Sequence, residues 1–370
     1  MKAHVCHLTS VHPADDIRIF HKECLSLAAQ GWQVTFVAPG NAALLPPGPV
    51  VWKLTKPFRG PTILRPLVSN LRSGWAACRT GADLFHFHDP ELIPSGLLLK
   101  GLGKRVIYDA HEDLPRTLHT KLWIPDRLRA RFGRLTELFE NGAARCFDGV
   151  IGATETISER FGRVAGNVVT VRNFPRWAEF EAPPPPLISR RRRVAYVGKV
   201  TADRGAGHLL RLSADLDSEV VVAGAVYPTS LEEALTAATS SSHLVLKGVV
   251  GREEVVDTLY QSQVGLLLLK PLPSYLDSLP IKLFEYMAAG VPVVASNFPR
   301  WRGIIEAAGC GYCVDPDDYR AVHAAVTEIL ADPRAAQGMS EQGRAFVREH
   351  YCWETEAERL DSLYKRVLCD

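Results

Sequence analysis

The chain has 370 residues, of which 46% are hydrophobic and 23% charged, as expected for a soluble globular protein of about two domains. A formal net charge of +2 gives no reason to expect a nucleic-acid partner. No apolar stretch reaches the ~20 residues that span a bilayer, and the N-terminus lacks the apolar segment of a signal peptide.

The eight cysteines are scattered along the chain, and several lie in apolar segments. This pattern favours free thiols in a reducing cytoplasm over a disulfide framework. Cys310 and Cys313 form a single CxxC pair, and no second pair of zinc ligands lies at a suitable spacing. We therefore expect a cytoplasmic protein and no metal site.

The first residues predict a βαβ unit. Residues 2–8 and 32–38 resemble strands, and 17–30 have helical periodicity. The loop between strand and helix carries His12 and Asp16, and in an open parallel sheet such a loop lies where ligands bind. Asp16 is equally well placed to cap the helix, and the two roles are compatible. The loop has no GxGxxG, which argues against a dinucleotide cofactor.

Two later strands each lead into a histidine and an acid. The strand predicted over 82–86 is followed by His88 and Asp89, and the strand predicted over 104–109 is followed by His111 and Glu112. A single histidine is usually structural, but two such groups at the same edge of a parallel sheet favour a functional site.

A basic helix is predicted over 125–144, with four arginines on it. The simpler interpretation is a solvated face. The alternative is peripheral contact with an anionic membrane surface, which would place the protein at the inner face of the cytoplasmic membrane.

A run of four prolines followed by four arginines interrupts the pattern in the middle of the chain, because prolines continue neither a helix nor a central strand. We therefore predict a first domain over 1–180, a linker over 181–193 and a second domain over 194–353. The C-terminal helix, within 354–370, has no strand of its own to pack on, and we expect it to join the first domain.

The second domain repeats the alternation of strands and helices. A strand over 194–197 leads into the loop Gly198–Gly205 and then a helix, and further strands are predicted over 219–224, 243–247 and 264–269. Both halves therefore predict doubly wound α/β domains.

Asp277 and Glu285 have seven residues between them at the start of a predicted helix over 281–289. Gly290 ends this helix, and 291–295 is a short buried strand. The pattern predicts acidic side chains at the helix start, on the side of the sheet where ligands bind.

These segments resemble the retaining glycosyltransferases of family 4, which have the GT-B fold. The loop Gly198–Gly205 matches the phosphate-binding loop of that family, with Lys199 in place of its arginine and Arg204 in place of its lysine. Asp277 and Glu285 match its pair of acids, with Asp277 in place of a glutamate, and are followed by Met-Ala-Ala-Gly-Val-Pro-Val-Val. The first half, with HPADDIRIFHKE and YDAHEDLP, is similar to the members that build bacterial surface polysaccharides.

The resemblance implies a GT-B fold of two Rossmann-like domains facing each other across a cleft, an acceptor domain and a nucleotide-sugar domain. It implies retaining sugar transfer from a nucleotide-diphosphate sugar to a saccharide or lipid-linked saccharide, with no metal and no other cofactor. The nucleotide base, the sugar and the oligomeric state are left open.

The resemblance also assigns residues. Glu285 would bind the ribose hydroxyls, Asp277 would face the donor sugar, and His111 would lie near the reacting centre. The other donor-binding candidates are Gly198, Lys199, Arg204, Lys247, Ser278, Leu279 and Lys282, and the acceptor-binding candidates are His12, Asp16, His88 and Glu112.

Two alternatives stay open. A nucleotide-sugar 2-epimerase on the same fold would release free nucleotide and an epimerised sugar without an acceptor. The other alternative is a non-catalytic nucleotide-sugar-binding protein. It is suggested by the three charged positions that depart from the family pattern.

Overall fold

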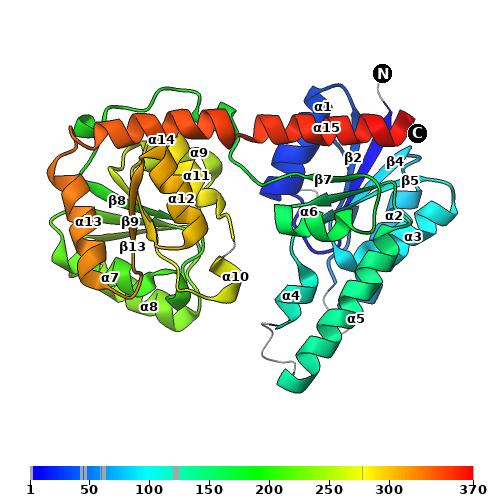
Figure 1. The fold of residues 1–370 in the computed structure, drawn as a ribbon, viewed down its shortest axis with the longest axis horizontal. Helices are drawn as coiled ribbons and strands as arrows, with labels where there is room; N and C mark the ends of the chain where they lie inside the picture. Colours follow the sequence, from blue (N-terminus) through cyan, green and yellow to red (C-terminus); the bar gives the residue numbers. More distant parts are fainter. Residues whose placement is uncertain are drawn as a thin grey trace. The chain divides into compact units, whose positions relative to one another are not determined.

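The computed structural model describes residues 3–41, 45, 48–58, 60, 64–119, 125–276 and 278–369. These residues form two compact units (Figure 1). Unit 1 consists of residues 1–173 and 353–370, and unit 2 of residues 174–352. Among the described residues, every helix is too short or too polar to cross a bilayer.

Unit 1 is built on a seven-stranded sheet in which every paired strand is parallel to its neighbour, in the order β3-β2-β1-β4-β5-β6-β7. Successive side chains of β1 point to opposite faces, so that Val5 lies in one apolar layer and Cys6 in the other. The strands are β1 His4–Leu8, β2 Gln33–Pro39, β3 Val51–Thr55, β4 Leu84–Phe87, β5 Arg105–Ala110, β6 Gly149–Gly152 and β7 Val168–Thr170.

Helices cover both faces of this sheet (Figure 1). The first helical segment, Ile17–Cys24, has π-helical hydrogen bonding and continues into α1 Leu25–Ala29. The C-terminal helix α15 lies in unit 1, because Trp353, Leu360 and Tyr364 are buried against β1 and β2. The remaining helices are α2 Arg65–Cys78, α3 Ile93–Gly101, α4 Leu114–His119, α5 Asp126–Ala144, α6 Glu155–Gly162 and α15 Trp353–Cys369.

Unit 2 has a six-stranded parallel sheet in the order β10-β9-β8-β11-β12-β13. The strands are β8 Arg193–Val197, β9 Glu219–Ala223, β10 Leu244–Gly248, β11 Val264–Leu267, β12 Val293–Ser296 and β13 Gly311–Val314. The helices are α7 Ala206–Asp215, α8 Thr229–Ala238, α9 Arg252–Tyr260, α10 Pro273–Leu276, α11 Ile281–Ala288, α12 Pro299–Ala308, α13 Tyr319–Ala331 and α14 Gln337–His350.

Both sheets reverse their strand order at one point, between β1 and β4 in unit 1 and between β8 and β11 in unit 2. This is the Rossmann strand order, in which the loops after the two strands at the reversal form a crevice for ligands. The prediction of two Rossmann-like doubly wound domains is confirmed, and the loops at the two reversal points are where ligands are expected to bind.

The boundary between the units differs from the predicted linker. Phe174 and Phe180 are buried in the core of unit 2, where Phe174 packs on Phe284, so unit 2 begins well before residue 181. Within the arginine run, Arg191 and Arg192 are exposed, whereas Arg190 and Arg193 are buried. Arg190 donates to the carbonyls of Pro185, Ser262 and Ala289, and Arg193 begins β8.

Candidate active site

The loop after β8 is shaped by close backbone packing. Gly198 has a φ of +99°, a conformation that favours glycine, and its amide donates to the Ala223 carbonyl at 2.8 Å. A Cβ on Gly224 would lie 2.1 Å from the Gly198 carbonyl oxygen, so the two glycines allow the loops after β8 and β9 to touch. Gly198 and Lys199 are exposed at the reversal point of the sheet.

Lys282, in the first turn of α11, lies against this loop. Its Nζ is 3.9 Å from the ring centroid of Tyr196 and would be 3.7 Å from a Cβ added to Gly198. The side chain is buried and finds no hydrogen-bond partner among the described residues. Burial and then the charge of Arg204 lower the pKa of Lys282 to about 7, against the opposing effect of Glu285. We call Gly198, Arg204, Lys282 and Glu285 the donor-side cluster.

Arg204 is half-buried and is held by an aromatic side chain. Its Nε donates to the Tyr275 hydroxyl at 3.3 Å, and its guanidinium lies 5.4 Å from the centre of that ring. A buried ammonium and a guanidinium therefore repel each other beside an open glycine loop, an arrangement that a bound anion stabilises.

Glu285, in the middle of α11, is buried and forms an ion pair with Arg252 of α9. The distance from Glu285 Oε1 to Arg252 Nη1 is 2.7 Å. Arg252 also pairs with Glu179, through Nη2 at 2.5 Å. One guanidinium thus fixes two carboxylates, and no local pattern predicts that Arg252 holds Glu285.

The other predicted donor residues differ in placement. Lys199 is exposed over the Tyr227 ring, and Lys247 is tied to α9 by hydrogen bonds to Glu254 and Thr258. The Ser278 hydroxyl donates to the Tyr275 carbonyl, Leu279 packs against the core, and Asp277 lies outside the described residues. The described geometry therefore joins Gly198, Arg204, Lys282 and Glu285, and it does not bring Lys247 to them.

In unit 1 the two loops at the reversal point are joined by Asp89. Its Oδ2 accepts from the Thr9 hydroxyl and the Ser10 amide, both at 2.6 Å, and its Oδ1 lies 3.0 Å from His12 Nδ1. Burial raises the pKa of Asp89, but hydrogen bonds from His12, Ser10 and Thr9 hold it well below the ordinary range. Burial likewise opposes the charged form of His12, and Asp89 nevertheless raises the pKa of that imidazole.

His88 and His111 meet beside Asp109, near the end of β5. His111 Nε2 lies 3.0 Å from Asp109 Oδ2 and 3.2 Å from His88 Nδ1. Arg18 Nη2 donates to both Asp109 oxygens at 3.1 Å, and its charge opposes the effect of burial and keeps the pKa of Asp109 well below its usual value. The side chain of His111 is 16% exposed, so it is the member of this group that a substrate can reach.

Two predicted acceptor residues stand apart. Asp16 caps the π-helical segment, since its Oδ1 accepts from the Arg18 and Ile19 amides at 2.9 Å. Glu112 is exposed beside His111. Capping, the alternative reading of Asp16, is therefore its observed role.

Further buried polar residues were not predicted. Each lies in an apolar strand or helix or comes from a distant part of the chain, so spacing alone did not reveal it. They are His7, Glu23, Asp109 and Tyr364, all buried in unit 1.

Family models match both halves of the chain. Residues 18–177 match the Glycosyl transferase 4-like domain, and residues 179–346 match the Glycosyl transferases group 1 family. The two matched segments correspond closely to the two units.

Individual relatives are distant. A GDP-mannose-dependent alpha-(1-6)-phosphatidylinositol monomannoside mannosyltransferase from Mycolicibacterium smegmatis is 26% identical over 223 residues, which are 55% of this chain and 58% of that protein. The chain spans about half the length of the curated relatives it matches.

Solved structures show the same fold over the full chain. A sucrose-phosphate synthase from Thermosynechococcus elongatus superposes with a TM-score of 0.73 at 18% identity, covering 100% of both chains. HepE from Anabaena in complex with UDP and glucose superposes with a TM-score of 0.71 at 11% identity, covering 99% of this chain and 100% of that one. The chain therefore belongs to the glycosyltransferases of the family 4 type, with the two Rossmann-like domains of the GT-B fold.

Proposed function

We propose that the protein transfers a sugar, with retention of anomeric configuration, from a nucleotide-diphosphate sugar to a saccharide or lipid-linked saccharide in cell-surface polysaccharide biosynthesis. The observation that carries this proposal is the donor-side cluster, where a buried ammonium and a guanidinium face a glycine loop at the reversal point of the sheet. A diphosphate supplies the negative charge that this arrangement lacks.

The cations of the cluster have a defined task in the reaction. As the glycosidic bond to the diphosphate breaks, negative charge grows on the leaving phosphate and must be neutralised. Lys282 and Arg204 supply donors for it, and the N-terminus of α11 adds its dipole. We therefore expect donor binding and transfer without a divalent metal or other cofactor.

Glu285 is the residue we assign to the ribose. Its buried carboxylate is oriented by the ion pair with Arg252, and we propose that it accepts from the ribose hydroxyls. Among the relatives, one is described as GDP-mannose-dependent and one structure contains UDP and glucose, so the nucleotide base stays open.

The acceptor is assigned to unit 1. His111 presents an accessible imidazole that Asp109 orients, which suits it to hold an acceptor hydroxyl. We propose that the proton of that hydroxyl passes to the leaving phosphate oxygen as the new bond forms on the same face of the sugar. The new glycosidic bond would then keep the anomeric configuration of the donor.

Helix α5 supports a peripheral membrane contact. Phe132, Leu135, Leu138 and Phe139 are 48–70% exposed on it, and Arg127, Arg131 and Arg134 are exposed as well. Exposed apolar and basic side chains on one helix suit the interface of an anionic membrane. We propose that this helix brings the enzyme to lipid-linked acceptors at the inner face of the cytoplasmic membrane.

A donor screen tests the proposal. UDP- and GDP-sugars are compared by thermal shift and calorimetry, and the products formed with and without acceptor are then identified by NMR. A glycosyltransferase forms an acceptor-dependent glycoside with the configuration of the donor. Epimerised sugar formed without acceptor identifies the 2-epimerase, and binding without any turnover identifies the non-catalytic alternative.

A further inference from the structure

Four buried side chains with metal-binding atoms meet in the core of unit 1. His7 comes from β1, Glu23 from the π-helical segment, and His86 and His88 from the end of β4. All four are at most 1% exposed, and one potential ligand atom from each lies within 4.8 Å of the others. Apolar cores rarely hold such a group without a compensating partner.

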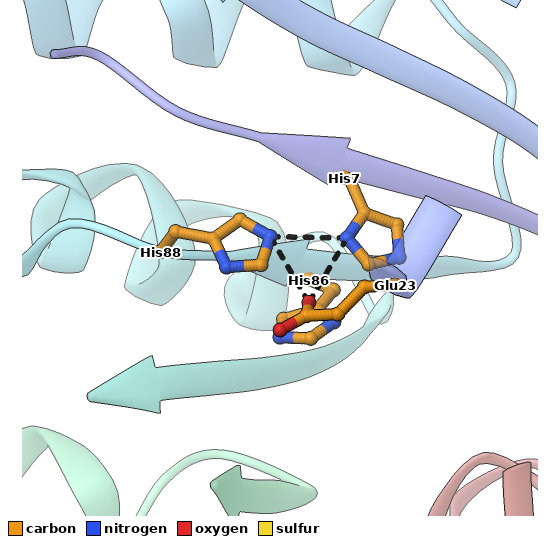
Figure 2. Close-up of side chains that lie close together, drawn as sticks. All are labelled: His7, Glu23, His86 and His88. Carbon is orange, nitrogen blue, oxygen red and sulfur yellow. Dashed lines mark hydrogen bonds and ion pairs between the residues drawn. The ribbon is translucent and has the colours of Figure 1, made fainter. Parts of the chain in front are cut away.

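Three of the four already have nearly the spacing of metal ligands. Figure 2 shows His7, His88 and Glu23 pointing toward one another, with lines joining them as a triangle. His7 Nδ1 and His88 Nε2 are 3.0 Å apart, and Glu23 Oε2 lies 3.8 Å from each nitrogen. Ligand atoms of tetrahedral zinc, with bonds of about 2.0–2.2 Å, are separated by about 3.3–3.6 Å. A zinc ion therefore fits between these atoms with small adjustments.

The opposite nitrogens of the two histidines are held by outer partners. His7 Nε2 lies 3.0 Å from the Tyr364 hydroxyl, and His88 Nδ1 lies 3.4 Å from Asp109 Oδ2. Histidines that bind metals characteristically have their second nitrogen held by a hydroxyl, carboxylate or carbonyl, which fixes the tautomer. The inward nitrogens, His7 Nδ1 and His88 Nε2, lie at hydrogen-bond distance from each other, and both can bind an ion once the proton between them is released.

A single arginine contacts both buried acids beside this group of residues. Arg18 is the cation shared by Glu23, through Nε at 3.1 Å, and by Asp109. Among the described residues, neither oxygen of Glu23 forms a hydrogen bond, and His86 Nε2 has no hydrogen-bond partner. A buried carboxylate and a buried imidazole are thus left with unused ligand atoms facing one small region.

We propose that His7, Glu23 and His88 bind one divalent transition-metal ion, of the zinc class, with His86 or a water molecule as the fourth ligand. Two or three neutral imidazoles and one carboxylate are ligands that zinc accepts. A second grouping, which replaces His7 and His86 by Asp109 and His111, is less suitable because Arg18 already occupies both oxygens of Asp109.

The ion joins β1, β4 and the π-helical segment and has a structural role. It lies in unit 1, whereas the residues assigned to the diphosphate lie in unit 2, so the inference does not depend on the proposed transfer reaction. His88, which we predicted to bind the acceptor, then acts on the acceptor only through its neighbour His111.

The test is metal analysis of the full-length protein, purified without chelator or affinity metal. We expect about one zinc per chain by elemental mass spectrometry. Removal of the zinc with a strong chelator should lower the Tm of unit 1, and added Zn²⁺ should restore it, with a shift of roughly 5–10 °C at a hundredfold excess over Kd. Co²⁺ in its place should give visible absorption bands of a four-coordinate site.

Variants locate the ion. Glu23→Gln and His88→Gln should each lose the zinc, while His4→Gln, a change on the same strand as His7 but outside the group, should retain it. Chelator-treated wild-type protein tests the proposal without any variant, in case the first two fail to fold. Metal-free wild-type protein whose Tm does not respond to Zn²⁺ overturns the proposal, and so does zinc that persists in both Glu23→Gln and His88→Gln.

Discussion

Arg252 Nη1 lies 2.7 Å from Glu285 Oε1, so a residue of α9 fixes the carboxylate that the family resemblance assigns to the donor ribose. The same guanidinium holds Glu179. This shared arginine allows the structural role of Glu285 to be separated from its binding role.

We predict that Glu285→Gln weakens UDP or GDP binding and that Glu179→Gln, the matched control, does not. Each change removes one carboxylate from the same partly exposed arginine, so each should lower the free energy of unfolding by a similar amount, about 1–3 kcal/mol. Calorimetric titration and denaturant unfolding check the two effects. Equal losses of nucleotide affinity in the two variants would show that Glu285 acts only through Arg252.

Lys282 should make nucleotide binding depend on pH. Its pKa of about 7 lies below the ordinary value of 10.5, so part of the population is neutral near pH 7 and most is neutral at pH 8. A bound diphosphate favours the ammonium and raises that pKa, so binding at pH 8 should take up nearly one proton, and affinity should fall by up to about tenfold per unit of pH above 7.

Calorimetry in two buffers of different ionisation enthalpy measures this uptake. Lys282→Met should abolish the proton uptake. Lys199→Met, at an exposed lysine of the same region, should weaken nucleotide binding but keep the proton uptake. Unchanged proton uptake in Lys282→Met would assign the titration to another group.

The His12–Asp89 pair should stabilise unit 1 most strongly in mildly acidic solution. The pKa of Asp89 is lower in the folded protein than the unfolded value of 3.8, so its carboxylate stabilises the fold above about pH 4. This stabilisation is lost as the pH falls from 3.8 toward the folded pKa. The raised pKa of His12 contributes stability below 6.5, and that contribution is lost as pH rises through the folded value. Both contributions are therefore present between about pH 4 and 6.5.

Thermal unfolding at pH 6 and pH 9 checks the pair. His12→Gln should reduce the difference in Tm between the two pH values, while His350→Gln, at an exposed histidine of unit 2, should leave it unchanged. An identical pH dependence in wild type and His12→Gln would contradict the assigned role.

Helix α5 should bind anionic vesicles at low salt. Replacing Leu138, which is 70% exposed, by Asp removes apolar contact and adds a repelled charge, so co-sedimentation with the vesicles should fall severalfold. Ile188→Asp is the control, since Ile188 is an exposed apolar residue of unit 2. Equal binding of the wild type and both variants would argue against this surface.

Much of the fold could be predicted because strands and helices alternate with clear periodicity. The short strand β13, Gly311–Val314, was missed because glycine and two cysteines near it gave no strand pattern, and β3 was missed in a proline-rich segment. The helices α4 and α12 were missed because each is short or begins at a proline. The final helix was expected to join the first unit because it has no strand of its own to pack on, and Tyr364 of this helix is buried in the core of that unit.

The candidate site was only partly predictable. Strand ends identified His88 and His111, and the glycine loop identified Arg204, because those signals are local in the sequence. Tyr364, by contrast, reaches His86 across 278 positions of the chain, and no local pattern reports such a contact. The arginine run falls in the predicted linker because charge alone does not show that Arg190 donates to a buried carbonyl or that Arg193 pairs with Glu219.

The most direct test of the central claim is the rate of nucleotide release from the preferred UDP- or GDP-sugar in the presence of acceptor, compared between wild type, Glu285→Ala and Arg204→Ala. If unit 2 binds and activates the donor as proposed, each variant should lose about 100-fold or more in kcat/KM while its circular dichroism and unfolding transition show a folded protein. Near-wild-type release by both folded variants would contradict the account.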